Sequence, residues 1–154
     1  MSRPVPELKS MVKELIGTPS VSSTQPDFDL SNEKIIHLLA NWLDPLGFNV
    51  EVAAIDGKPG KYNLIASVGS GGGGLLLAGH SDTVPFDDHL WRSDPFILTE
   101  REDRWYGLGT CDMKSFFALA IEAALPFLEA PLARPLTIMA TADEESSMSG
   151  AKAL

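Results

Sequence analysis

The sequence predicts an α/β fold with a mixed, largely parallel sheet flanked by helices. Apolar residues recur at helical spacing in three segments, and short apolar or β-favouring runs alternate with these segments along the chain. Polar residues gather where the two most apolar runs end, at residues 80–82 and 143–145. Such an alternation favours an open sheet whose functional site lies beyond the carboxyl ends of its strands.

The first half of the chain contains two predicted helices and a hairpin. Apolar side chains three and four positions apart predict amphipathic helices over residues 6–17 and 35–46, with glycine near the end of each. β-favouring runs at residues 48–55 and 62–68 flank the sequence DGKPG, which is typical of a tight turn. We expect these runs to form a hairpin, followed by a flexible turn at the glycine-rich residues 70–74.

The second half contains two short apolar runs separated by a third helix. Residues 75–79 and 136–142 are almost continuously apolar and predict buried strands. Between them, residues 96–99 and 104–106 are expected to form short strands. Residues 114–128 predict a helix of small and apolar side chains that is buried on most sides.

Composition excludes several classes of protein. The 154 residues suffice for one hydrophobic core, and 12 Lys and Arg against 21 Asp and Glu give a net charge of −9, which disfavours binding to nucleic acid or anionic lipid. A single cysteine, Cys111, cannot form an internal disulfide, and the start of the chain lacks the pattern of a secretory signal. No apolar stretch reaches the roughly 18 residues of a membrane span. We therefore expect a cytoplasmic protein without nucleic-acid or membrane partners.

His80 and Asp82 follow the first apolar strand and form the first candidate site. Residues two apart in extended backbone share a face, so the two side chains are expected to point the same way. One imidazole nitrogen can then ligate a metal while the carboxylate accepts a hydrogen bond from the other nitrogen. A purely structural His–Asp pair in a turn is the alternative.

Asp112 lies in the second candidate segment, GLGTCDMK at residues 107–114, just before the third helix. A dinucleotide loop is excluded, because the third glycine is missing and Asp112 would place negative charge where a pyrophosphate binds. Asp112 is therefore either a metal ligand or a cap of the helix. The neighbouring Cys111 is expected to pack in the core.

Three adjacent carboxylates, Asp143, Glu144 and Glu145, follow the last apolar strand. They repel one another unless a cation is present, although a solvated acidic turn is the alternative. Glu144 and Glu145 face opposite ways in extended backbone, so one can ligate a metal and the other can carry a proton for metal-bound water. Together with His80 and Asp112 they offer the mixed nitrogen and oxygen ligands that Zn²⁺ accepts.

The three segments resemble the signature segments of the zinc-dependent aminoacylase, desuccinylase and carboxypeptidase family. They read GHSDTVP at residues 79–85, GLGTCDMK at residues 107–114 and TADEES at residues 141–146. Their order, spacing and flanking sequence agree over essentially the whole chain, and details within residues 86–96 look most like the deacetylases. The resemblance implies a zinc-peptidase-like catalytic domain.

The resemblance also implies the role of each site residue. His80 is expected to ligate one zinc ion, Asp112 to bridge two, Glu145 to ligate the other, Asp82 to orient His80, and Glu144 to act as general base. Two zinc ions, with cobalt as an alternative, would serve the hydrolysis of a small N-acyl amino acid. A homodimer is expected for the complete enzyme.

Other ligands of the family pattern have no counterpart in the sequence. The family takes a later carboxylate and histidine, and it has a lid and dimerisation domain. His37 falls on the polar side of its helix and His89 lies in a loop, so both are expected at the surface. The chain also stops about one turn into a helix that starts within residues 146–150. We interpret residues 1–154 as the amino-terminal part of the catalytic domain and expect the isolated chain to be inactive, with a non-catalytic fragment as the other reading.

Overall fold

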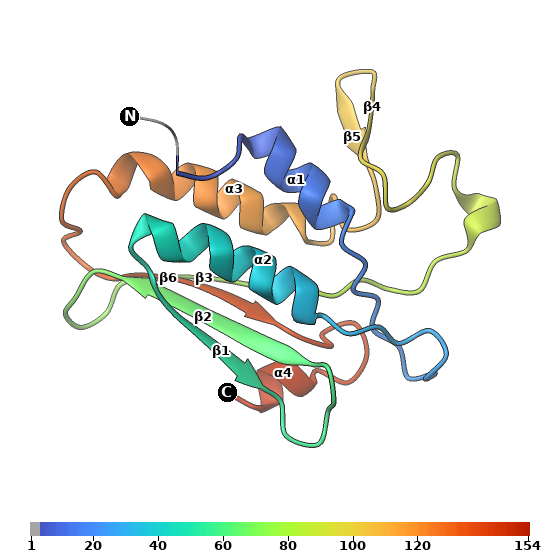
Figure 1. Cartoon of the computed structure of the whole chain (residues 1–154), viewed down its shortest axis with the longest axis horizontal. Coiled ribbons are helices and arrows are strands. Elements are labelled where there is room, and N and C mark those ends of the chain that lie inside the picture. The colour runs from blue at the N-terminus through green and yellow to red at the C-terminus, as the bar shows by residue number, and fades with distance from the viewer. Residues whose placement is uncertain (1–3) are drawn as a thin grey trace.

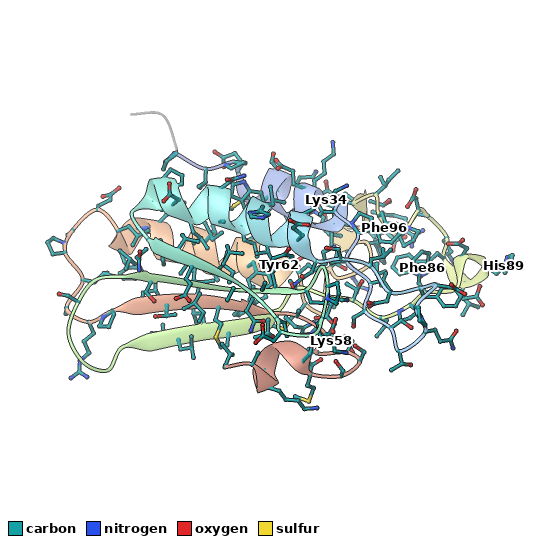
Figure 2. The ribbon with its side chains drawn as sticks, turned by 60° about the horizontal axis from the view of Figure 1, so that its bottom comes forward. Lys34, Lys58, Tyr62, Phe86, His89 and Phe96 are labelled. Atoms are coloured by element: carbon teal, nitrogen blue, oxygen red, sulfur yellow. The ribbon has the colours of Figure 1, made fainter. Side chains whose placement is uncertain are left out.

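Helices cover one face of a mixed sheet in the computed structural model, which describes residues 4–154 (Figure 1). These helices are α1 (Leu8–Ile16), α2 (Glu33–Leu43) and α3 (Ser115–Ala124). The short α4 (Ser149–Lys152) lies on the other side of the sheet, as Figure 2 shows. The predicted α/β fold is confirmed. Residues 1–3, part of the start that lacks a secretory pattern, lie outside the described residues.

The strands of this sheet lie in the order β1-β2-β6-β3. Their bounds are Asn49–Ala54 for β1, Tyr62–Val68 for β2, Leu136–Thr141 for β6 and Leu75–His80 for β3. Only β3 and β6 are parallel, whereas β2 is antiparallel to both β1 and β6. The prediction of a largely parallel sheet is therefore wrong for the described strands. The short turn between β1 and β2 permits only antiparallel pairing, and β2 then takes the place beside β6.

The predicted helices and hairpin of the first half are confirmed. Helix α2 continues into a 3₁₀ turn, η1 (Asp44–Leu46), and ends at Gly47, whose φ of 86° is the left-handed conformation that glycine adopts without strain. Strands β4 (Thr99–Arg101) and β5 (Arg104–Tyr106) form a separate ribbon. Within residues 4–154, the structure has no helix long and apolar enough to cross a membrane.

The core lies between the three helices and the sheet. Fully buried side chains come from every layer, and each contributes about 1.5–3 kcal/mol through removal from water. Examples are Leu15, Ile36, Leu39, Phe117 and Ile138. This packing fixes the helices against β2 and β6, and so it sets the frame for the loops at the ends of the strands.

Three expectations about burial need correction. Strand β3 lies at the edge of the described sheet, so Leu75 and Leu76 are 58% and 53% exposed instead of buried. On and after α3, Leu119 and Phe127 are 53% and 68% exposed, so this segment is buried on one side. Cys111 is exposed and does not pack in the core, because the loop before α3 runs over the surface.

Candidate metal centre

The parallel pairing of β3 and β6 builds the centre. His80 is level with Thr141 in the register, and the N–H of Ser81 donates to the carbonyl of Thr141 at 2.9 Å. Both strands therefore end at one edge, where the chain after β6 turns back toward His80. One ligand atom from each of His80, Glu144 and Glu145 lies within 4.8 Å of the others. Segments more than 60 positions apart thus meet as a group of possible metal ligands.

Asp112 approaches the same group from the loop before α3. Its Oδ1 lies 3.0 Å from Nε2 of His80, while most of its side chain, 74%, is exposed. Helix α3 begins at Ser115 without a side-chain cap, so capping is not the role of Asp112. The carboxylate instead faces the ring nitrogen that points into the centre.

The other ring nitrogen of His80 faces Asp82. Nδ1 lies 3.1 Å from the backbone oxygen of Asp82 and 3.6 Å from its carboxylate Oδ1, so the carbonyl is the nearer partner. Burial alone lowers the pKa of His80, but hydrogen bonding and charge from Asp82, helped by Asp112, outweigh it and raise the pKa to about 9. The ring is therefore held in one orientation among carboxylates.

Asp82 also holds the turn that carries the two glutamates. Its buried carboxylate accepts hydrogen bonds from the Ser22 hydroxyl at 2.6 Å and from the backbone N–H groups of Glu144 and Glu145 at 3.2 and 3.1 Å. Burial raises its pKa, but His80, Ser22 and the two N–H groups outweigh burial, so the pKa is lowered. Asp82 is an ionised anchor between β3 and the turn after β6.

The electrostatics of the centre favour a cation. Burial and the nearby charge of Asp112 raise the pKa of Glu145, despite the opposing effect of His80. Glu144, by contrast, is 44% exposed, with Oε2 3.8 Å from Nε2 of His80. One imidazole and several carboxylates form a donor set of the kind that Zn²⁺ accepts, so the residues present fit the metal.

Comparison with known proteins agrees with this arrangement. The model of the peptidase family M20/M25/M40 matches residues 76–154, just over half of the chain. The chain belongs to this family. It is 53% identical over 152 residues to a protein named acetylornithine deacetylase from Proteus mirabilis, and 51% identical over 152 residues to one of the same name from Photorhabdus laumondii. Those matches cover 99% of this chain but only 39% and 40% of the relatives.

Solved structures share the fold of this M20-family chain. Human carnosine dipeptidase 1 matches with a TM-score of 0.75 and 26% identity, over 96% of this chain and 33% of that one. A metallo-carboxypeptidase of the M20 family from Sulfolobus solfataricus matches with a TM-score of 0.73 and 23% identity, over 92% and 32%. The chain therefore spans about a third of each of these proteins.

The two remaining histidines of the M20-family chain do not join the centre. The side chain of His37 is 57% exposed on α2, 3.9 Å from Glu33. His89 lies in a 3₁₀ turn, η2 (Asp88–Leu90), at the far end of the molecule in Figure 2. Both expectations of surface positions are confirmed.

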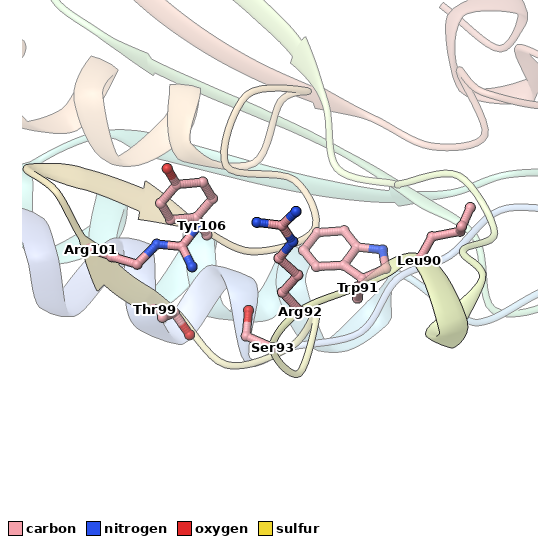
Figure 3. Close-up of a pocket in the computed structure, with 7 residues that line it drawn as sticks. All are labelled: Leu90, Trp91, Arg92, Ser93, Thr99, Arg101 and Tyr106. Atoms are coloured by element: carbon pink, nitrogen blue, oxygen red, sulfur yellow. The ribbon is translucent and has the colours of Figure 1, made fainter.

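A separate cavity of about 380 Å³ lies beside the β4–β5 ribbon (Figure 3). Arg92, Arg101, Trp91 and Tyr106 contribute to its walls, and the Arg101 guanidinium lies 4.9 Å from the centre of the Tyr106 ring. None of the residues that line it belongs to the metal centre.

Sequence reasoning missed buried polar residues on the segments around the centre. Asn63 accepts the N–H of Ala142 at 3.2 Å and donates to the carbonyl of Gly150 at 2.8 Å, so it ties β2 to the residue after β6 and to α4. Lys114, two positions after Asp112, is fully buried and donates to the carbonyl of Thr18 at 2.7 Å, so it ties the loop before α3 to the residues after α1. Burial lowers its pKa to about 7. Nothing in the sequence distinguishes such residues from surface polar residues.

Proposed function

We propose that the complete protein hydrolyses the N-acetyl amide of N2-acetyl-L-ornithine to L-ornithine and acetate with zinc. The observation that carries this proposal is the meeting of His80, Glu144 and Glu145 within 4.8 Å in a chain that is 51–53% identical to proteins named acetylornithine deacetylase. Under this proposal the protein acts in the cytoplasm, in arginine biosynthesis.

The proposed roles are those that the family resemblance implies, and the positions of the side chains support them. His80, Asp112 and Glu145 would hold the zinc ions, which supply an acidified water and polarise the acetyl carbonyl. Glu144, 44% exposed beside His80, takes a proton from the attacking water and passes it to the departing amine. Asp82 keeps His80 and both glutamates in position.

Residues 1–154 are proposed to be the amino-terminal part of the catalytic domain. The chain spans 39–40% of the relatives named above, so the remaining metal ligands and a lid and dimerisation domain would come from the rest of a homodimeric protein. The isolated chain is then inactive. A succinyl-diaminopimelate desuccinylase or a broader aminoacylase is the nearest alternative, since the residues that select the acyl group and side chain would lie largely outside these residues.

A substrate panel tests the proposal. The full polypeptide that contains residues 1–154 is stripped with a chelator, reloaded with zinc, and assayed for amine release from N2-acetyl-L-ornithine, N-succinyl-diaminopimelate, other N-acetyl amino acids and a dipeptide. We expect kcat/KM to be highest for acetylornithine by at least about tenfold, roughly 1.4 kcal/mol of transition-state stabilisation. A preference for the succinyl substrate would establish the alternative, and the absence of zinc-dependent hydrolysis would contradict both.

A further inference from the structure

A buried lysine lies directly behind the acidic turn of the metal centre. The side chain of Lys61, the residue before β2, is 4% exposed, and its Nζ lies 2.7 Å from Oδ1 of Asp29 and 2.7 Å from Oδ1 of Asp143. It also donates to the carbonyl of Leu30 at 2.8 Å. Burial by itself lowers the pKa of Lys61, but the two carboxylates outweigh burial and raise it. The ammonium donates hydrogen bonds to Asp29 and Leu30, and its contact with Asp143 is an ion pair, since Oδ1 of Asp143 has no hydrogen-bond partner among the described residues.

Asp143 connects this lysine to the two glutamates that follow it. Its φ of 56° is in the left-handed region, which Asp adopts more readily than most residues with a side chain but which surrounding contacts still have to stabilise. Its backbone oxygen accepts the N–H of Met148 at 2.6 Å, and its Oδ2 accepts the Ser149 hydroxyl at 2.8 Å. The turn is thus held on one side by Asp82 and on the other by Lys61.

We infer that Lys61 is a positioning residue of the metal centre, because its ion pair with Asp143 fixes the turn from which Glu144 and Glu145 reach toward His80. The inference rests on the proposed function. Without the ion pair, the Asp143 carboxylate loses its cationic partner and the left-handed backbone loses a contact that holds it. A shift of the glutamates by about 1 Å is enough to impair both metal binding and catalysis.

The surroundings of Lys61 provide a matched control. A cavity of about 320 Å³ is lined by Lys61, Asp29, Asp143 and also by Lys58. Lys58 is exposed, and among the described residues it has no ion pair. Lys58→Met therefore removes one positive charge from the wall of the same cavity, as Lys61→Met does, but it leaves the ion pair of Asp143 intact.

The test measures zinc affinity in the full polypeptide that contains these residues. For Lys61→Met we expect zinc, competed with a chelator, to bind about 10- to 100-fold more weakly, as for other residues that orient metal ligands, and kcat to fall more than KM rises. Lys58→Met should behave as the wild type. Lys61→Ala leaves a space beside the cavity, so added methylammonium should restore zinc affinity, whereas tetramethylammonium, which cannot donate a hydrogen bond, should not.

Wild-type zinc affinity in Lys61→Met, or an equal loss in Lys58→Met, would overturn the inference. Where Lys61→Met does not fold, Asp143→Asn keeps the size of the side chain and removes the charge that pairs with Lys61. Zinc affinity unchanged from wild type would overturn the inference equally. Zinc affinity also separates this inference from the proposed function. If Lys61→Met loses zinc and the zinc-loaded wild type does not hydrolyse acetylornithine, the proposed substrate is refuted and the positioning role of Lys61 is supported. A wild type that binds no zinc would overturn both.

Discussion

The carboxylate of Asp82 accepts a hydrogen bond from the backbone N–H of Glu145 at 3.1 Å. Its other oxygen accepts the N–H of Glu144 at 3.2 Å, and the backbone of Asp82 contacts the ring of His80. One buried anion therefore sets the distance between the end of β3 and the turn after β6. Its role is wider than the orientation of one imidazole, because it places the two glutamates as well.

Replacement of Asp82 by Asn should show this double role. The amide has one acceptor oxygen where the carboxylate has two, so one of the two backbone N–H groups is left facing an NH₂ group. We expect zinc affinity to fall about 10- to 100-fold, measured by calorimetric titration. Asp87→Asn, which alters an exposed carboxylate that accepts the N–H of His89, is the control. Unchanged zinc affinity in Asp82→Asn would mean that the turn holds its shape without the anion.

Replacement of Glu144 and replacement of Glu145 should impair different properties, kcat for the first and zinc affinity for the second. Glu144→Gln removes the proposed base and should lower kcat about 10²- to 10⁴-fold while zinc stays bound. Glu145→Gln removes a proposed ligand and should lower zinc affinity first. Zinc content by elemental analysis, measured beside kcat, distinguishes the two. If Glu144→Gln instead loses zinc, Glu144 is a ligand, a role that its place within 4.8 Å of His80 and Glu145 also allows.

The site was more predictable from sequence than the sheet that carries it. Short-range patterns singled out His80 and the acidic turn where β3 and β6 end, and the family resemblance added Asp112 just before α3. The direction of β2 relative to β6 and the exposed edge at Leu75 depend on pairing between distant segments, which periodicity does not encode. Apolar runs alone do not distinguish a central strand from an edge strand.

The supporting residues were unpredictable for a different reason. Ser22 and Lys61 lie in segments that read as polar loop and turn, and a lysine is expected at the surface unless its partners are known. Those partners, Asp82 for the serine and Asp29 and Asp143 for the lysine, are 60, 32 and 82 positions away. Only the folded chain brings them together.

Zinc binding should depend steeply on pH because of His80. In the metal-free protein its pKa is about 9, so below this pH zinc must displace a proton from the ring. We expect zinc affinity to fall about tenfold per pH unit below pH 9, with about one proton released per ion at pH 7. Calorimetry in buffers of different ionisation enthalpy counts this proton. No proton release at pH 7 would show that His80 is neutral before the metal binds.

The same shift affects the stability of the metal-free protein in a defined window. The folded pKa of His80 lies above its ordinary value of 6.5, so its stabilising contribution is complete below about pH 6.5 and is lost as the pH rises toward 9. We expect His80→Asn to lower the free energy of unfolding more at pH 6 than at pH 9. An equal loss at both values would contradict the raised pKa.

Lys114 should have the opposite dependence. Burial lowers its folded pKa from 10.5 to about 7, so the unfolded chain binds more protons between these values and stability rises with pH. Lys114→Met lacks this pH-dependent cost. We expect the free energy of unfolding of the variant minus that of the wild type to increase by on the order of 4 kcal/mol from pH 10.5 to pH 7. Urea denaturation at several pH values measures it, with Lys13→Met as an exposed control. A difference that does not change with pH would show that the ammonium stays charged in the fold.

Gly150 tests how tightly α4 is seated on the end of β6. A Cβ at this position would lie 2.5 Å from the backbone nitrogen of Ala142, 2.6 Å from its oxygen and 2.6 Å from Oδ1 of Asn63, so the helix would have to move. Alanine favours a helix over glycine by about 1 kcal/mol, so intrinsic propensity alone predicts a gain in stability for Gly150→Ala. We expect the free energy of unfolding to fall by about 1–3 kcal/mol instead, because the added methyl group would clash with backbone atoms that are fixed by the sheet.

The control for this substitution is Gly72→Ala. Apart from the chain neighbours, no atom of the described residues lies within 4 Å of a Cβ built at Gly72. The stability of Gly72→Ala should therefore stay within about 0.5 kcal/mol of the wild type. Thermal unfolding measures the stability of both variants, and zinc titration then tests whether the packing of α4 affects the metal centre. The two are connected because the N–H of Gly150 donates to the carbonyl of Ala142 at 3.1 Å, next to the acidic turn. Gly150→Ala should therefore weaken zinc binding as well as the fold. A variant more stable than the wild type, with unchanged zinc affinity, would show that α4 can withdraw from β6 without disturbing the glutamates.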